Sequence, residues 1–421
     1  MASVAQIILL FKNSRTTDKG GSVKWQRVRD ETPVTKRYAY FDTAAAAPPV
    51  RSAVQAMTDY LAKTVDSGPY LPSLRAEIYR KIEDIRGKTA QFIGAEPEEI
   101  AFTRNGTESI SLVGRGIAWK AGDELILPDT EMLSNVAVWR QLESETGIRI
   151  ITVKADEHGL IDPESVAHAI TERTRLISFV FLSNVTGAVQ PVAQICQVAR
   201  RAGILTHVDA AQSLGMIPTD INQIGCDFLS ACTRKGLRSV EGSGILYVRQ
   251  EHISSLSPAL AGWWNASIGE DGGIGFPDTA RRFEAGSPNV PVILALEKAI
   301  DYAESIGVAD IEAQVRELTE YAVTKIRSID GASVYGPLDS AHRLGIIPFN
   351  VAGIDPAELV SALEEQGIII ESGHFMATSI LKAYGIETMA RASLHYFNSP
   401  TEIDRMISII ESFLEKERGM H

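Results

Sequence analysis

The chain has 421 residues, more than one ordinary core accommodates, so its length predicts two domains or one large domain with a smaller satellite. Apolar residues make up 45% of the chain and charged residues 22%, a composition that is typical of a folded globular protein and excludes a disordered one. A formal charge of −12 without a basic stripe argues against a nucleic-acid partner, because nothing would offset phosphate repulsion.

Residues 1–37 are predicted to form an N-terminal extension. Their apolar run AQIILLF lacks a basic region and is too short to span a bilayer. It therefore predicts a packing segment or dimer arm, and we expect neither a signal nor a membrane contact. The polar stretch KNSRTTDKGGS predicts a loop.

Three scattered cysteines are too few for a disulfide framework or a zinc cluster, which indicates a reducing cytoplasm and no metal site.

The next part of the chain predicts two helices and then a strand, a glycine turn and a third helix. Helical periodicity runs over residues 50–64 and again over about 74–93, after the turn YFDTAAAAPP. The strand, turn and third helix come from IAFTRNGTESISLVGRGI. Because the free N–H groups at the start of a helix bind anions, Gly106 and Thr107 are predicted to contact a phosphate.

Strands and helices then alternate. ELILP, IRIITV and RLISFVFLSN predict buried strands, and helices are expected after the first of them and over residues 163–171 and 191–202. This alternation is typical of an α/β protein with a parallel sheet. A long amphipathic pattern over residues 290–328 leads into a second, shorter alternation, which predicts a compact α/β lobe that closes over a site.

The most informative stretch lies at residues 204–248. One apolar run ends at Asp209, and a second ends just before Arg234 and Lys235. Open α/β sheets assemble their sites at the carboxyl ends of such strands. An acid and a lysine there suit pyridoxal phosphate (PLP), because the lysine can hold its aldehyde as a Schiff base and the acid can keep its ring nitrogen protonated. Taken alone, Asp209 could also be a helix N-cap and Lys235 a solvated loop charge.

Several motifs carry a family resemblance. HVDAAQS, TRK, GSGILYV and RRFEAGSPN resemble segments of fold-type I PLP enzymes in the class V aminotransferase and cysteine desulfurase superfamily, and the likeness extends from Tyr40 to Phe413. The nearest branch holds group II desulfurases, isopenicillin epimerases and C–S lyases. The resemblance implies a large domain with a mostly parallel seven-stranded sheet over residues 38–292 and a small C-terminal α/β domain over 293–421. Residues 38–60 are the part of the large domain that could pack with the small one.

The resemblance also assigns residues to the cofactor. Arg234 would grip the phosphate with its guanidinium fork, and Met132 stands where the family usually places a histidine that stacks on the ring. Ser287 would reach the cofactor phosphate of a neighbouring subunit, which implies a homodimer with shared sites. The full set of implied cofactor contacts is Gly106, Thr107, Met132, Asn184, Asp209, Gln212, Cys232, Arg234, Lys235 and Ser287.

The substrate contacts that the resemblance implies are Ala45, Asn184, Glu371 and Arg391. Arg391 matches the arginine that pairs bidentately with an amino acid's α-carboxylate. The desulfurase lid carries an arginine and, five residues later, a nucleophilic cysteine; this chain has Glu371 and Met376 at those positions. A thioether cannot form a persulfide. A carboxylate at 371 disfavours an acidic side group and could instead receive an amine or hydroxyl.

These residues predict a PLP-dependent enzyme that acts at Cα and Cβ of an amino acid. Lys235 would take the Cα proton as general base, and Asp209 would keep the cofactor ring electron-poor. The leading hypothesis is a C–S β-lyase acting on a cysteine-derived thioether or sulfoxide, rather than a persulfide-forming desulfurase. Alternatives are a class V aminotransferase, an epimerase or a decarboxylating deaminase of an amino-acid-containing metabolite, and, as a different class, a non-catalytic fold-type I scaffold.

Overall fold

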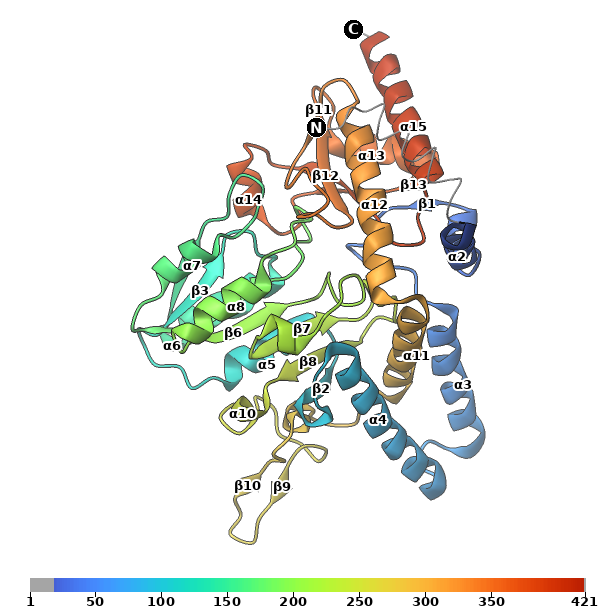
Figure 1. Ribbon diagram of the computed structural model, residues 1–421. Coiled ribbons are helices and arrows are strands. Elements are labelled where there is room, and N and C mark those ends of the chain that lie inside the picture. Colours follow the sequence, from blue (N-terminus) through green and yellow to red (C-terminus); the bar gives the residue numbers. More distant parts are fainter. Residues whose placement is uncertain (1–18, 420–421) are drawn as a thin grey trace.

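A seven-stranded sheet forms the centre of the protein, and its strand order is β2–β8–β7–β6–β5–β3–β4. The computed structural model describes residues 19–419 (Figure 1). Strand β8 runs antiparallel to both neighbours, and all other adjacent pairs are parallel. The predicted mostly parallel sheet is therefore confirmed. The strands are β2 (Ile100–Thr103), β3 (Glu124–Pro128), β4 (Arg149–Val153), β5 (Thr174–Val180), β6 (Leu205–Asp209), β7 (Phe228–Cys232) and β8 (Gly244–Val248).

Two hydrophobic clusters lie on opposite faces of this sheet. Strand β3 contributes Ile126 to one cluster, and it contributes Leu125 and Leu127 to the other, as the period of two in a strand requires. Every residue of β3, β7 and β8 is buried, which explains the uninterrupted apolar runs of the sequence. The helices that accompany these strands are α5 (Gly106–Gly116), α6 (Ser134–Thr146), α7 (Pro163–Ala169), α8 (Val192–Arg201), α9 (Ile221–Ile224) and α10 (Gln250–Ile253), with 3₁₀ turns η2 (Pro97–Glu99) and η3 (Ala280–Phe283).

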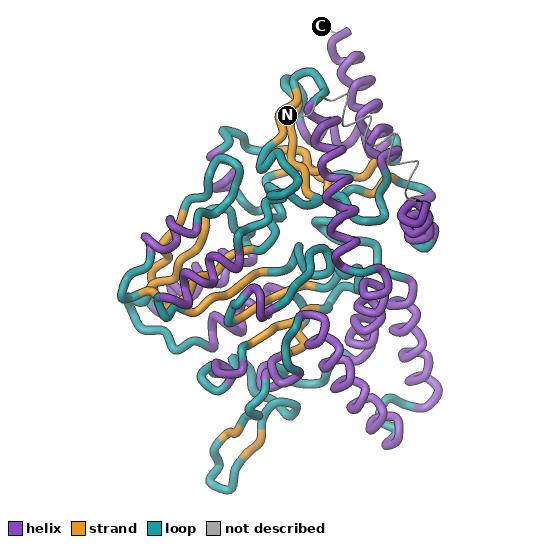
Figure 2. The backbone as a smooth tube through the Cα atoms, in the orientation of Figure 1, coloured by secondary structure: helices purple, strands orange, loops and turns teal. Residues whose placement is uncertain are grey.

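A second lobe is built on an antiparallel four-stranded sheet with the order β11–β12–β15–β14 (Figure 2). Its core also takes Ala39 and Phe41, because β1 pairs in parallel with β13. The predicted boundary between residues 292 and 293 falls inside α11, and the domain division remains a proposal. The elements are β1 (Ala39–Tyr40), β11 (Ala332–Val334), β12 (Ile346–Val351), β13 (Ile368–Ile369), β14 (Glu371–Gly373), β15 (Met389–Ser393), α11 (Val290–Ile306), α12 (Val308–Arg327), α13 (Pro356–Glu365), α14 (Thr378–Ala383) and α15 (Pro400–Gly419).

The predicted loop KNSRTTDKGGS is wrong in its last four residues, which begin helix α2 (Lys19–Asp30), followed by the 3₁₀ turn η1 (Pro33–Lys36). Tertiary contacts override the poor helix propensity of the two glycines. Lys24 donates to the Ile306 carbonyl at 2.6 Å, and Arg29 donates to the Phe397 carbonyl at 2.6 Å. The AQIILLF run, predicted as a packing segment or dimer arm, lies outside the described residues.

Two long helices and one hairpin extend from the lobe that contains the large sheet. Helices α3 (Arg51–Ser67) and α4 (Pro72–Ile93) confirm the two predicted helices, and both contact α11. The hairpin of β9 (Ser267–Ile268) and β10 (Ile274–Gly275) projects from the body at the bottom of Figure 1. Among the described helices, none is long and apolar enough to cross a membrane.

Candidate functional site

Most of the predicted cofactor contacts lie at one edge of the large sheet. Asp209 is the last residue of β6, and Cys232 is the last residue of β7, three residues before Lys235. Asn184 follows β5, and Met132 follows β3. Because these four strands are parallel neighbours, their carboxyl ends meet at the same edge. The sheet therefore gathers side chains from four separate segments.

Asp209 and Lys235 influence each other's ionisation. Burial raises the pKa of the Asp209 carboxyl, which accepts a hydrogen bond from Ala211 N at 2.9 Å, and the positive charge of Lys235 opposes that rise. Burial lowers the pKa of the Lys235 amine, with Cys232 and Asp209 opposing the change and Arg234 adding to it. The structure thus brings the predicted acid and lysine together, and it favours a neutral amine at Lys235.

Two glycines hold the loops after β6 and β7 against each other. Gly215, in the first loop, has a φ of +84°, which favours glycine. A Cβ added to Gly236, in the second, would overlap the Leu214 carbonyl oxygen and lie 2.7 Å from Met216 Cγ. Because neither glycine has a side chain, the main chains of the two loops can pack directly against each other. This contact fixes the position of Lys235 relative to Asp209.

The amino terminus of α5 lies beside the end of β7. Asn105 caps this helix, because its Oδ1 accepts a hydrogen bond from Glu108 N at 2.9 Å. A Cβ on Gly106 would lie 3.6 Å from the Ala231 carbonyl carbon, so Gly106 faces the strand that leads to Lys235, and Thr107 is exposed. A helix start of this kind can hold a phosphate, and the phosphate contacts of Gly106 and Thr107 remain a prediction.

The alanine segment after β1 is tied to the loops that carry the predicted site. Gln212 Nε2 donates to the Ala44 carbonyl at 2.9 Å, and Arg234 Nη1 donates to the Ala45 carbonyl. One nitrogen of the Arg234 fork is therefore engaged with the main chain. Cys232 Sγ donates to the Ala211 carbonyl at 3.6 Å, and burial raises the pKa of its thiol.

Arg391 joins the second lobe to this edge. It lies on β15, its side chain is 3% exposed, and its Nη1 donates to the Asn184 carbonyl at 2.9 Å. Glu371 on β14 forms an ion pair with it, as does Asp42, whose carboxylate lies 3.3 Å from Nη2. Asp42 was missed by the sequence reasoning, because the segment between β1 and α3 shows no pattern that points to residue 391.

The two remaining predicted cofactor contacts are Met132 and Ser287, which lie far apart in the sequence and line different parts of the structure. Met132 is half-buried at the turn between β3 and α6, where Ser134 N approaches its Sδ at 3.4 Å. Ser287 is exposed and lines a hollow of about 160 Å³ together with Tyr70 and Trp263. The lining of this hollow includes none of the other predicted cofactor contacts of the same chain. Ser287 also lines a second hollow, of about 350 Å³, together with Arg104 and Glu108 near the first turn of α5.

A buried polar network below this edge was also missed. Glu131 Oε2 accepts a hydrogen bond from Asn135 Nδ2 at 2.7 Å, and its Oε1 accepts from Val180 N at 2.9 Å. Burial raises the pKa of Glu131 to about 8, and the nearby charge of Asp209 adds to the rise. The available signal was a glutamate three residues after the strand ELILP, at the same edge as Asp209.

The network continues through the sheet. Ser178 Oγ bonds Asn135 Oδ1 at 2.8 Å and His207 Nδ1 at 2.8 Å, and His207 Nε2 bonds Ser230 Oγ at 2.9 Å. Burial lowers the pKa of His207 to about 3, so its ring is neutral. These bonds connect strands β5, β6 and β7 directly beneath the residues of the site.

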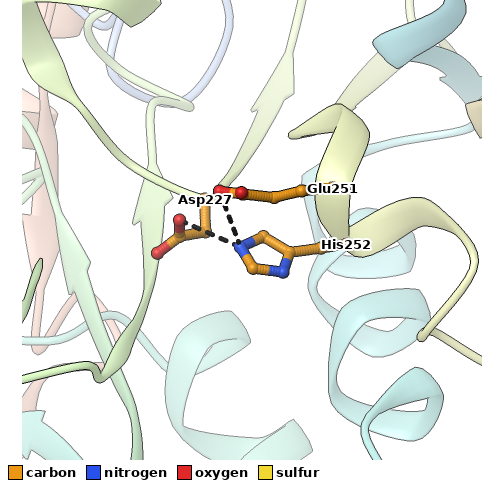
Figure 3. A group of neighbouring side chains, drawn as sticks. All are labelled: Asp227, Glu251 and His252. Carbon is orange, nitrogen blue, oxygen red and sulfur yellow. Dashed lines mark hydrogen bonds and ion pairs between the residues drawn. The ribbon is translucent and has the colours of Figure 1, made fainter.

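Asp227, Glu251 and His252 form a second cluster of ionisable groups (Figure 3). It lies at the amino end of β7, opposite to the edge of the predicted site. Asp227 comes just before β7, and its Oδ1 lies 3.1 Å from Arg249 Nε and 3.2 Å from His252 Nε2. Hydrogen bonds from His252 and Thr206 outweigh burial and lower the pKa of Asp227. Because Arg249 already pairs with the Asp227 carboxylate, we interpret the cluster as a structural group of ion pairs at the amino end of β7.

The residues at the carboxyl edge fit PLP. A buried carboxylate and a lysine with a lowered pKa stand on adjacent strand ends, and an exposed helix start with free N–H groups lies beside them. Asp209 can pair with the ring nitrogen, Lys235 with the aldehyde, and the first turn of α5 with the phosphate.

Comparisons with known proteins agree with this fit. The family model described as Aminotransferase class-V matches residues 39–406. A probable cysteine desulfurase of Methanothermobacter thermautotrophicus is 34% identical, over 94% of this chain and 99% of its own. The apo structure of a cysteine desulfurase from Thermococcus onnurineus NA1 aligns with a TM-score of 0.88 at 30% identity, over 93% of this chain and 98% of its own. A variant of C-DES with glycine covalently linked to its PLP cofactor shares the fold, with a TM-score of 0.83 and 23% identity over 91% of this chain and 98% of its own.

These relatives contradict the predicted C–S β-lyase. The prediction gave more weight to the single lid residue Met376 than to the resemblance of the whole chain. Relatives at 30–34% identity over nearly the full length are named cysteine desulfurases. Likeness over nearly the full length of the chain outweighs the chemistry of one side chain at the lid. The chain belongs to the class V aminotransferase family and is a PLP-dependent enzyme of fold type I.

Proposed function

We propose that the protein is a cysteine desulfurase, which removes the sulfur atom of free L-cysteine and leaves L-alanine. The observation that carries the proposal is the pairing of Lys235 and Asp209 in a chain that matches named desulfurases over 94% of its length. The family alone also accommodates amino transfer, so the products of the reaction decide between the two.

Three residues would carry the reaction. The amine of Lys235 takes the Cα proton of the substrate, and burial, which lowers its pKa, favours the neutral form that this step needs. When bound, PLP supplies an electron sink for the bonds at Cα. Asp209 holds a negative charge against the ring nitrogen, and Arg391 pairs with the substrate's α-carboxylate. Arg391 already reaches the edge of the sheet, where its Nη1 donates to the Asn184 carbonyl.

The thiol that accepts the sulfur comes from a second molecule. The chain has three cysteines, all of them buried, and burial raises the pKa of each thiol. At the lid, Met376 is 52% exposed and offers only a thioether. The balanced reaction is L-cysteine plus a thiol giving L-alanine plus the persulfide of that thiol. The bond from carbon to sulfur breaks, and the new sulfur–sulfur bond forms on the acceptor.

The holoenzyme should convert L-cysteine to alanine in the presence of dithiothreitol, with sulfide released in equal amount. Lys235→Ala should lower the rate at least about 100-fold, because it removes the general base. Amino-acid analysis and a sulfide assay measure both products. Pyruvate and ammonia in place of alanine, or amine transfer that depends on an added keto acid, would contradict the proposal.

A homodimer with shared sites is part of the proposal. The exposed Ser287 lines one hollow with Trp263 and Tyr70, and these two aromatic side chains are 59% and 60% exposed. Large exposed aromatic side chains in one patch are typical of protein interfaces. The hydroxyl of Ser287 would then reach the cofactor phosphate of the second subunit.

A further inference from the structure

We propose that Glu371 occupies Arg391 in the substrate-free enzyme and that the substrate's α-carboxylate displaces it, so that residue 371 determines how tightly carboxylates bind. This inference rests on the proposed function in one respect, namely that the substrate is an amino acid held by Arg391. It makes Glu371 a specificity-determining residue at the entrance to the site.

Strand register places the two residues together. Glu371 on β14 lies directly opposite Arg391 on β15 in an antiparallel pair, where cross-strand side chains contact each other. Glu371 Oε2 pairs with Arg391 Nη2. The contact is therefore built into the sheet of the second lobe and does not depend on the conformation of a loop.

Glu371 satisfies Arg391 incompletely. The Nη1 nitrogen donates to the Asn184 carbonyl, and Nη2 serves Glu371 and Asp42, but the buried Nε has no hydrogen-bond partner. The guanidinium also lies over the Phe375 ring, with its central carbon 4.0 Å from the ring centroid. An unpaired buried donor is costly, and a carboxylate that bridges Nε and Nη2 would remove the cost. A bidentate ligand thus has an advantage over Glu371.

Exposure decides which internal acid leaves. The side chain of Glu371 is 44% exposed, whereas that of Asp42 is 18% exposed. Asp42 is also held by the backbone, because its bridge to Ser393 joins it to β15. Glu371 can turn towards solvent without leaving a buried charge unpaired, so it is the residue that an incoming carboxylate replaces.

Repulsion between carboxylates favours a substrate carboxylate that replaces Glu371 at Arg391 over one that binds beside it. Burial raises the pKa of Asp42 to about 6, Arg391 lowers it, and the Glu371 charge and its hydrogen bond to Asp42 raise it. The charge of Arg391 also acts on Lys235, together with the charges of Arg234 and Asp209. A third carboxylate beside Asp42 and Glu371 would place three acids on one guanidinium, which like-charge repulsion disfavours. The same repulsion selects against substrates with a second acidic group.

The test measures binding, without catalysis. The probe is 3-(methylthio)propionate, which has the carboxylate and sulfur spacing of the substrate but no amine to react with the cofactor. Calorimetry with the holoenzyme should show that Glu371→Gln binds this probe about two- to fivefold more tightly than the wild type, the equivalent of one lost competing ion pair. The neutral 3-(methylthio)propanamide should bind equally to both proteins, because it does not need the arginine.

Two further variants make the test specific. Glu371→Ala should show the same gain, whereas Glu365→Gln, an exposed acid on α13, should bind like the wild type. Unchanged or weaker binding of the carboxylate probe by both residue-371 variants would overturn the inference. Alanine formation is measured on the same preparations. A gain in binding without alanine would reject desulfuration and keep the role of Glu371, and alanine without a gain in binding would do the reverse.

Discussion

At the scale of single residues, Glu131 shows how one buried acid is kept from competing with another. Its pKa is raised to about 8 by burial, although Asn135 and Val180 donate hydrogen bonds to it. It is therefore mostly protonated at pH 7, and in that neutral form it does not add a second negative charge beside Asp209. A second carboxylate at this edge would otherwise weaken the fixed charge that the ring needs.

This protonation makes stability depend on pH. The folded protein keeps a proton on Glu131 that the unfolded chain releases above about pH 4.5, so stability falls as the pH rises from there to about 8, by at most about 1.4 kcal/mol per unit. Glu131→Gln removes this titration. We expect its thermal midpoint to gain on that of the wild type between pH 5 and 8 and the difference to stay constant above pH 9. Calorimetric scans measure it, with the exposed Glu157→Gln as control; parallel profiles for the wild type and Glu131→Gln would contradict the expectation.

At the scale of elements, the position of Lys235 depends on the contact between the loops after β6 and β7. Gly236→Ala would place a methyl group against the Leu214 carbonyl, and a main-chain oxygen cannot move aside as a side chain can. We expect a loss of about 1–3 kcal/mol in stability and a lower PLP content, because the loop must shift and carries Lys235 with it.

The control for this substitution is Gly87→Ala. Gly87 lies inside α4, and a Cβ there would meet only Pro97 Cγ at 4.0 Å, so alanine should be neutral or slightly stabilising. Thermal midpoints and the absorbance of bound PLP measure both variants. Equal cofactor content in the two would show that the loop contact does not position Lys235.

Elements also differ in how far the sequence predicts them. The parallel strands were predictable, because strands buried on both faces have continuous apolar runs, and Asp209 and Lys235 could be found because each follows such a run. Helix α2 was not, because contacts of Lys24 and Arg29 with distant residues hold it. The cluster of Asp42, Glu371 and Arg391 comes from three separate segments, and only the register of β14 and β15 brings two of them together.

At the scale of the whole molecule, several exposed apolar side chains lie on α3 and around the β9–β10 hairpin. Leu61 and Val65 lie on α3, Trp263 lies in the loop before β9, and Ile268 and Ile274 are paired across the β9–β10 hairpin. Surfaces of this kind are typical of contacts between subunits. Ser287 borders the hollow between Tyr70 and Trp263, so a second subunit seated there would receive its hydroxyl.

Subunit mixing tests whether Ser287 serves a neighbouring site. Lys235→Ala and Ser287→Arg should each be inactive alone, the first through loss of the amine and the second through a bulky side chain at the phosphate. When the two are coexpressed, a mixed dimer has one complete site, formed by Lys235 of one subunit and Ser287 of the other. Random pairing makes half of the dimers mixed, so about one quarter of the wild-type rate should return. If Ser287 acts within its own chain, every site keeps one defect and the mixture stays inactive, because no pairing can restore both residues to the same site.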